Sequence, residues 1–429
     1  MNFQPEESFA RALDDADPLR RYREQFHIPQ RPDGRPAIYF CGHSLGLQPR
    51  ATRALVEQEL DAWARLGVGG HFRGKNPWYS FHENFRETGA RLVGAHPGEV
   101  VFMNSLTVNL HLMMATFYQP TPTRYRTLMD APVFPSDLYA MQSQLRHHGF
   151  EASEGLLLIE GGSEDIEAAL AECGREIAVV LLSGVNFLTG QYFDVPRLAE
   201  TARRQGCVFA LDLAHAAGNV ELSLHDWQVD FAVWCSYKYL NAGPGAVGGC
   251  FVHEKHGRDV ALPRLAGWWG NDPSTRFHMH TQTTFTARAG ADGWQISNPP
   301  ILAMAPLLAS LTLFGEAGMP ALRAKSERLT GYLHYLLERL PGRHIEIITP
   351  AEPARRGCQL SLLVRDRPRE LLAALEVEGV VCDFREPNVI RVAPVPLYNT
   401  FHEVWTFARI LEQFLSRSPK VHAASPRRL

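Results

Sequence analysis

The sequence predicts an α/β protein built around a mostly parallel β-sheet. Short apolar runs typical of strands recur along the first part of the chain and alternate with segments of helical periodicity. One run, residues 177–182, is apolar at nearly every position, which is typical of a strand buried on both faces of a sheet. The other predicted strands of this region are residues 100–103, 126–129, 208–211 and 231–234.

The helical segments and the later strands predict how the chain divides into domains. A first helix is predicted at 51–66, another begins near Thr107, and two amphipathic helices at about 301–314 and 319–340 lead into a second region. That region, with strands at 360–364 and 389–392 and a helix at 368–378, predicts a small C-terminal α+β domain. We therefore expect four parts, which are an N-terminal arm (1–50), a large domain (51–310), a small domain (311–416) and a disordered tail (417–429).

Composition excludes several classes of protein. The chain has 429 residues, of which 45% are hydrophobic and 21% charged, and its net charge of -3 does not indicate a nucleic-acid or membrane partner. The longest apolar stretch, residues 301–314, contains Pro306 and falls short of the roughly 20 residues that span a bilayer. The seven cysteines form no C-x-x-C pair, so we expect reduced thiols, no metal site and a cytoplasmic location.

Lys238 is the first candidate catalytic residue. It follows the strand at 231–234 and precedes the turn Asn241-Ala-Gly-Pro-Gly245, in aromatic and apolar surroundings. The alternative, a solvated surface charge, suits most lysines but fits these neighbours poorly. A desolvated lysine has a lowered pKa and can act as a nucleophilic amine, which favours a Schiff base with pyridoxal phosphate (PLP).

Asp212 supplies the second group that PLP chemistry needs. It ends the predicted strand 208–211, and a carboxylate against the pyridine nitrogen keeps that nitrogen protonated. It lies 26 residues before Lys238, which leaves room for a crossover helix and one more strand. Both side chains would then emerge at the carboxyl ends of parallel strands. His215 could bond to Asp212 or to the cofactor, while the alternative for Asp212 is a cap on the following segment.

Further candidates surround this pair, each with a structural alternative. Phe134 could stack on the cofactor ring beside Asp137, or Pro135 and Ser136 could simply form a turn. Residues 104–109 could bind phosphate at a helix N-terminus or be an ordinary N-cap.

Two more candidates and two loops complete the set. Tyr237 adjoins Lys238 and can donate its phenol proton. Arg391 lies inside an apolar strand and needs an anion, either a substrate carboxylate or a structural salt-bridge partner. Residues 267–270 and 297–300 are predicted to be loops, for which turn formation with aromatic packing is the alternative to a role in the site.

At these residues the chain resembles the kynureninases, PLP-dependent enzymes of tryptophan catabolism. The resemblance covers about residues 15–415 and is carried by distinctive stretches at 212–222, 234–243, 275–277, 296–301 and 391–399. A cysteine desulfurase would share the Asp…Lys layout but not these segments. The resemblance implies fold type I, in which a large domain with a mostly parallel seven-stranded sheet carries a small C-terminal α+β domain.

The resemblance also implies a role for each matching residue. Lys238 would hold PLP as an aldimine, Asp212 would pair with the pyridine nitrogen, and Tyr237 would complete the catalytic set. The implied cofactor-binding residues are Leu106, Thr107, Phe134, Pro135, Ser136, Asp137, Ser183, Asp212, His215, Tyr237, Lys238 and, from a neighbouring subunit, Trp268 and Asn298. The implied substrate-binding residues are Ser44, His71 and Arg391. One departure is His43, at a position where the resemblance leads us to expect Asn.

The implied reaction is hydrolysis of L-kynurenine or 3-hydroxy-L-kynurenine to anthranilate or 3-hydroxyanthranilate and L-alanine, in a homodimer that shares its active sites. His71 and Asn298 could face the substrate's aromatic ring, which predicts a preference for the 3-hydroxy substrate and a place in pyridine nucleotide (NAD) biosynthesis. In the alternative, His71 packs against Trp78 and Asn298 only shapes a turn. The competing hypothesis from another class is a non-catalytic binding protein on the same scaffold.

Overall fold

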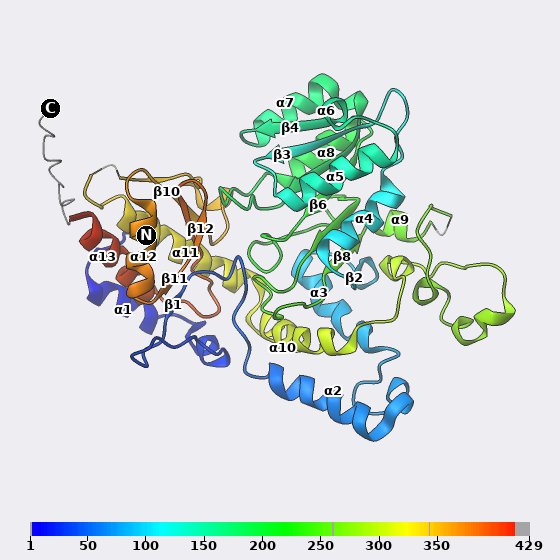
Figure 1. Ribbon diagram of the computed structural model, residues 1–429, viewed down its shortest axis with the longest axis horizontal. Coiled ribbons are helices and arrows are strands. Elements are labelled where there is room, and N and C mark those ends of the chain that lie inside the picture. Colours follow the sequence, from blue (N-terminus) through cyan, green and yellow to red (C-terminus); the bar gives the residue numbers. More distant parts are fainter. Residues whose placement is uncertain (1, 260, 343, 417–429) are drawn as a thin grey trace, which may run out of the picture.

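The structure is a computed structural model that describes residues 2–259, 261–342 and 344–416 (Figure 1). Its centre is a seven-stranded sheet in the order β2-β8-β7-β6-β5-β3-β4. Five neighbouring strands run parallel, whereas β8 is antiparallel to both β7 and β2. The strands are β2 (Val100–Phe102), β3 (Arg126–Ala131), β4 (Leu156–Glu160), β5 (Ile177–Ser183), β6 (Val208–Asp212), β7 (Phe231–Trp234) and β8 (Gly249–Val252). The predicted mostly parallel seven-stranded sheet is therefore confirmed.

Helices cover both faces of this sheet, so its central strands are buried on both sides. Val180 and Leu182 of β5 belong to one hydrophobic cluster, while the alternate residues Val179 and Leu181 belong to another. This alternation explains the continuous apolar run of β5. The helices of this part are α2 (Thr52–Leu66), α3 (Arg86–Val93), α4 (Leu106–Phe117), α5 (Pro135–His147), α6 (Ala152–Gly155), α7 (Ser163–Cys173), α8 (Val195–Arg204), α9 (Glu254–Gly257) and α10 (Ile301–Ala317).

A second, smaller domain, made of one sheet and the helices packed on it, follows α10. A four-stranded antiparallel sheet in the order β12-β13-β10-β9 packs with three helices around a third hydrophobic cluster. Its strands are β9 (Ile345–Ile347), β10 (Leu360–Val364), β12 (Asp383–Arg385) and β13 (Val389–Val392), and its helices are α11 (Met319–Leu337), α12 (Pro368–Val377) and α13 (Phe401–Ser416).

The N-terminal arm joins this small domain. Helix α1 (Glu7–Asp15) packs against α13, and β1 (Ile38–Tyr39) pairs with β11 (Val380–Val381). Figure 1 shows the arm, in blue, lying against the orange and red elements of the C-terminal part. The arm is thus built into the small domain's core, to which Ala10, Leu13 and Phe40 contribute.

One predicted helix is missing from the structure, and another is present and slightly longer than predicted. No helix forms between Asp212 and Lys238, because residues 213–230 run as successive turns before β7, so the predicted crossover helix was wrong. The predicted helix at about 301–314 is confirmed as α10, which continues through Pro306 to Ala317. Pro306 is only the sixth residue of that helix, close enough to the N-terminus that few backbone bonds are lost.

Two further predictions concern the C-terminal tail and membrane-spanning segments. The predicted disordered tail, 417–429, lies outside the described residues. Among the described helices none is by itself both long and apolar enough to cross a membrane, and α10 and α11 meet that test only as a pair bent by 82°.

Candidate active site

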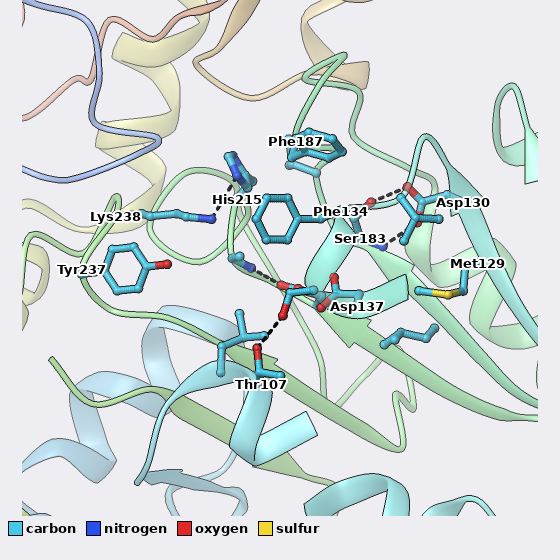
Figure 2. Close-up of a pocket in the computed structure, with 17 residues that line it drawn as sticks. Thr107, Met129, Asp130, Phe134, Asp137, Ser183, Phe187, His215, Tyr237 and Lys238 are labelled. Atoms are coloured by element: carbon cyan, nitrogen blue, oxygen red, sulfur yellow. Dashed lines mark hydrogen bonds between the residues drawn. The ribbon is translucent and has the colours of Figure 1, made fainter. Parts of the chain in front are cut away.

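A cavity opens at the carboxyl ends of β3, β5 and β6 (Figure 2). Most of the predicted cofactor-binding residues line it together with several that the sequence did not single out. The lining residues are Leu106, Thr107, Met129, Asp130, Val133, Phe134, Ser136, Asp137, Leu181, Ser183, Val185, Phe187, Asp212, Ala214, His215, Tyr237 and Lys238. Figure 2 shows Lys238 and Asp137 approaching this space from opposite sides, with Phe134 between them.

Lys238 reaches the cavity from the turn that follows β7. The backbone N–H of Asn241 donates to the carbonyl of Lys238 (2.9 Å), and that of Ala242 donates to Ser236 (3.0 Å). Asn241 has a φ of 56°, in the left-handed region that Asn tolerates better than most residues. This tight turn buries the Lys238 side chain, which is 9% exposed, so the surface-charge alternative was wrong.

His215 is the direct partner of the lysine. Its Nε2 lies 3.1 Å from Lys238 Nζ. Burial, followed by the charges of Lys238 and Arg391, lowers the pKa of His215 well below its usual value. The imidazole is therefore neutral and can accept a hydrogen bond from the lysine ammonium, which holds Nζ in the cavity.

Two carboxyl groups face each other on the opposite side. Asp212, the last residue of β6, accepts a hydrogen bond from the N–H of Ala214 (2.6 Å), which is a turn cap rather than a helix cap. Burial, together with the neighbouring Asp212, raises the pKa of Asp137 well above its usual value. Asp137 is therefore protonated, and its buried Oδ1 has no hydrogen-bond partner among the described residues.

Two helix N-termini meet at the same cavity. Thr107 lies in the first turn of α4 and Ser136 in the first turn of α5, and their hydroxyl oxygens are 2.8 Å apart. The side chain of Ser105, at the N-cap of α4, makes no capping bond, so the backbone N–H groups there are not satisfied by it. Free N–H groups and two hydroxyls at converging N-termini favour a phosphate.

These observations fit PLP. Lys238 offers an amine for its aldehyde, the Asp137–Asp212 pair offers a carboxylate and an unpartnered oxygen for its ring polar atoms, and the two N-termini suit its phosphate. The Phe134 ring centroid lies 5.7 Å from Lys238 Nζ, so this ring can pack against a cofactor attached to the lysine. Phe134 is the N-cap of α5, so residues 134–137 begin a helix and are not an isolated turn.

Asp130 is a cavity residue that directly follows the predicted strand 126–129 and was not among the candidates. It is 3% exposed and accepts hydrogen bonds from Ser183 N (2.7 Å), from the Ser183 hydroxyl and from Asn186 Nδ2 (3.0 Å). It therefore ties the end of β3 to the end of β5. Its signal was the same as that of Asp212, an acidic residue closing an apolar strand, but no nearby lysine drew attention to it.

Arg391 and Ser44, two of the predicted substrate contacts, lie outside the cavity lining. Arg391 is paired within the chain, because its Nε and Nη2 contact the Asp383 carboxylate at 2.9 and 2.8 Å and its Nη1 donates to the Phe187 carbonyl at 2.6 Å. The structural salt bridge is thus present. Phe187 also lines the cavity, so Arg391 is hydrogen-bonded to the backbone of a cavity-lining residue. Ser44 lies on a turn in which its backbone N–H donates to the carbonyl of Cys41 (2.9 Å).

Four further predicted site residues do not line the cavity of this single chain. Trp268 is 38% exposed, and Asn298 is exposed as well. His71 packs edge-on against Trp78, with ring centroids 5.4 Å apart, which is the alternative contact considered for it. Pro135 starts α5 and sets its backbone without facing the cavity.

Known proteins match the chain over almost its whole length. A family model described as the kynureninase C-terminal domain matches residues 322–411. A protein of Myxococcus xanthus (strain DK1622) named Kynureninase is 55% identical over 417 residues, which are 96% of this chain and 97% of that protein. A protein of Koribacter versatilis (strain Ellin345) with the same name is 53% identical, over 95% of this chain and 97% of its own length.

Solved structures share the fold at low sequence identity. A cysteine desulfurase from Thermococcus onnurineus NA1 superposes with a TM-score of 0.72 at 19% identity, over 88% of this chain and 94% of its own. A mutant of C-DES, with glycine covalently linked to its PLP cofactor, has a TM-score of 0.73 at 18% identity, over 91% of this chain and 99% of its own. The fold is therefore that of the PLP-dependent enzymes of fold type I, and the sequence relatives identify the chain as a member of the kynureninase family.

Proposed function

We propose that this protein hydrolyses L-kynurenine, or its 3-hydroxy form, to anthranilate or 3-hydroxyanthranilate and L-alanine, with PLP bound to Lys238. The observation that supports this most is the buried Lys238–His215 pair, 3.1 Å apart, in a cavity that Asp212 also lines. PLP bound there supplies an electron sink for the carbon atoms next to the amino group of the substrate. The same proposal places the protein in tryptophan catabolism and in pyridine nucleotide biosynthesis.

Lys238 moves the first proton. Once the substrate's amino group has displaced it, the Lys238 amine would take the proton from the substrate's Cα. His215 contacts Nζ as a neutral imidazole, so it steers the amine by a hydrogen bond without adding a positive charge. The Asp212 carboxylate would pair with the ring nitrogen of the cofactor, which favours protonation of that nitrogen.

Tyr237 is the proposed proton donor to Cβ, which completes alanine. Burial and the neighbouring Cys235 raise the pKa of the Tyr237 phenol, so the group keeps its proton. Its ring centroid lies 5.9 Å from Lys238 Nζ, on the cavity wall. Because the phenol keeps its proton on the cavity wall, it is available to donate that proton.

Arg391 is the proposed anchor for the substrate's α-carboxylate, with Ser44 and His71 as further substrate contacts. A guanidinium has five N–H donors, and the bonds to Asp383 and Phe187 use three of them. Two donors are left for a carboxylate. Asp383 orients the guanidinium while they bind.

A homodimer is part of the proposal. Large apolar side chains are exposed around the loops that carry Trp268, including Phe72 at 60% and Phe277 at 54%, whose ring centroids are 5.6 Å apart. An exposed aromatic patch of this kind marks a protein interface. A second subunit on this patch would bring Trp268 and Asn298 to the neighbouring cavity, which they do not reach within their own chain.

The domain division and the cellular location also remain proposals. We place the large domain at 51–310 and the small domain at 311–416. All seven cysteines are free thiols, which supports the reducing cytoplasm.

The proposed function is tested by incubating the purified, PLP-loaded protein with L-kynurenine and measuring anthranilate and L-alanine together. Equal amounts of both products support hydrolysis at Cβ–Cγ. Binding of PLP and kynurenine without release of either product would favour the binding protein on the same scaffold.

A further inference from the structure

The turn at 41–46 connects the two halves of the site. Cys41 forms a parallel bridge with Ala393, two residues beyond Arg391. At the other end, Gly46 N–H donates to the carbonyl of Tyr237 (2.8 Å), next to Lys238. The turn therefore runs from the strand that carries Arg391 to the loop that carries Lys238.

Close contacts fix this turn in place. A Cβ on Gly42 would collide with the Tyr398 hydroxyl, and a Cβ on Gly46 would collide with the Lys238 carbonyl and the Asn241 side chain. The backbone N–H of Ser44 also donates a hydrogen bond to the carbonyl of Cys41, at the start of the turn. Only glycine fits at both ends, so the backbone between them, which carries His43, Ser44 and Leu45, has a defined position.

His43 is buried and lacks a partner. Its exposed fraction is 0%, and neither ring nitrogen has a hydrogen-bond partner among the described residues. A buried polar group without a partner costs about 1–3 kcal/mol. The His43 ring centroid lies 6.4 Å from that of His215, the residue that holds Lys238 Nζ.

The charges around His43 are mainly positive. Burial, and then Arg391, Lys238 and Arg385, lower its pKa well below the usual value. The ring is therefore neutral and carries one N–H donor and one acceptor nitrogen. The positive charges of Arg391, Lys238 and Arg385 therefore favour an anion over a cation beside the ring.

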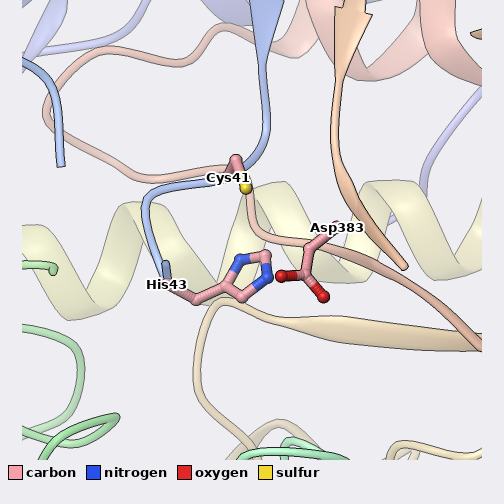
Figure 3. Close-up of side chains that lie close together, drawn as sticks. All are labelled: Cys41, His43 and Asp383. Atoms are coloured by element: carbon pink, nitrogen blue, oxygen red, sulfur yellow. The ribbon is translucent and has the colours of Figure 1, made fainter. Parts of the chain in front are cut away.

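A cation is the weaker alternative at this place. Cys41, His43 and Asp383 lie close enough to share a metal ion, and Figure 3 shows the His43 ring beside the Asp383 carboxylate. Asp383 is already paired with Arg391 (2.8 Å) and with Arg385 (3.0 Å). A metal ion bound to Asp383 would lie next to the two positively charged guanidiniums of Arg391 and Arg385, which disfavours it.

We propose that His43 is a second binding residue for the α-carboxylate of the amino-acid substrate, donating its ring N–H beside Arg391. This inference rests on the proposed function, because the substrate's amino nitrogen reaches Lys238 and its carboxylate reaches Arg391. His43 lies on the turn that joins those two residues, so the carboxylate next to Cα comes within its reach. The bound carboxylate supplies the partner that the buried ring lacks.

The test is the equilibrium binding of L-alanine to the PLP-loaded protein, measured from the change in its visible absorbance spectrum. L-alanine carries the same carboxylate and amino groups but no aromatic ring, and its binding needs no turnover. His43→Leu removes the donor, while His43→Asn and His43→Gln each place an amide N–H near one of the two ring nitrogens. His82→Leu is the matched control, because His82 is also buried, at 2% exposed, with both ring nitrogens unpartnered among the described residues.

We expect His43→Leu to raise the Kd for L-alanine about 10-fold or more, the usual effect of removing a hydrogen bond to a charged group. One of the two amide variants should stay within about threefold of wild type, and PLP content and the Kd of His82→Leu should not change. If His43→Leu does not hold PLP, the two amide variants decide, and their Kd values should differ by about fivefold or more.

Three results would overturn the inference. They are an unchanged Kd in His43→Leu, equal Kd values in the two amide variants, and no measurable L-alanine binding by wild type. The proposed function is decided separately by kynurenine turnover in wild type, so turnover with an unchanged Kd in His43→Leu rejects the role of His43 alone.

Discussion

The part of this site that one chain builds differs from the part proposed to come from a second subunit. On the cofactor side, Lys238, Asp212 and Thr107 come from strand ends and helix starts of one domain and meet in a single chain. Trp268 and Asn298, the two residues proposed to come from a neighbouring subunit, are exposed and do not line that cavity. The difference indicates that one chain assembles the groups for the electron-sink chemistry, whereas the proposed roles of Trp268 and Asn298 depend on a second chain.

Lys238→Ala gives the largest expected effect, on the cofactor side. No other residue that lines the cavity supplies an amine, so alanine release from kynurenine should fall to background. The measurement is L-alanine release by the variant under the conditions used for wild type. PLP can still bind non-covalently, so cofactor content serves as the control for folding. Substantial release without an added amine would contradict the assignment.

Asp212→Asn should cost roughly 3 kcal/mol or more of transition-state stabilisation, a fall of about 100-fold or more in kcat/KM. A neutral amide cannot favour a protonated pyridine nitrogen as a carboxylate does. Asp226→Asn, on the exposed turn between β6 and β7, is the matched control and should leave kcat/KM unchanged. A change of less than about threefold in Asp212→Asn would show that another group does this work.

A mixing experiment tests the comparison itself. Trp268→Ala should lower kcat/KM by about 10-fold or more if its ring packs in a neighbouring site. When Trp268→Ala and Lys238→Ala subunits are mixed, half of the dimers are mixed, and each mixed dimer has one site with both residues intact. Activity should return to about one quarter of wild type for random pairing. Mixtures that stay as inactive as the separate variants would place Trp268 in its own chain's site.

Substrate choice is expected to respond less strongly. A site that bonds a hydroxyl discriminates against the analogue without it, so wild type should prefer 3-hydroxykynurenine in kcat/KM. The double variant His71→Trp with Asn298→Thr should lose most of that preference. Equal or better use of kynurenine by wild type would refute it. If the double variant keeps the preference for 3-hydroxykynurenine, these two residues do not set it, and the His71–Trp78 contact is structural.

The smallest expected effect concerns pH and the apoprotein. Asp137 has a raised pKa in the folded state, so its contribution to stability is present at low pH and is lost as pH rises through that pKa. Asp137→Asn should therefore raise the Tm of the PLP-free protein by about 2 °C at neutral pH, with no gain at acidic pH. A thermal melt at several pH values checks this. A loss of stability at neutral pH would contradict the buried, protonated state of Asp137.

The predictability of the fold follows the same division. Strands β5, β6 and β7 were evident in the sequence, because central strands buried on both faces are continuous apolar runs. Strand β8 was missed, since its four residues begin with glycine and pair antiparallel at the side of the sheet. The turns at 213–230 replaced the predicted helix, and spacing alone could not tell the two apart.

The candidate site shows the same limit. Lys238 and Asp212 were found because each contradicts its apolar surroundings, which a single chain displays directly. The Arg391–Asp383 pair could not be predicted, because the two residues meet only through the antiparallel pairing of β12 with β13. The position of His43 near the Arg391 side of the site also depends on the fold, through the bridge between Cys41 and Ala393, two residues beyond Arg391.

The central claim is that Lys238 carries PLP in a site that cleaves kynurenine. The most direct measurement is the absorbance spectrum of the purified protein with PLP, recorded before and after L-kynurenine is added. The account predicts a yellow protein whose visible band changes at once with substrate and returns as anthranilate and L-alanine accumulate in equal amounts. A protein without that band, or a band that does not respond to kynurenine, would contradict the account.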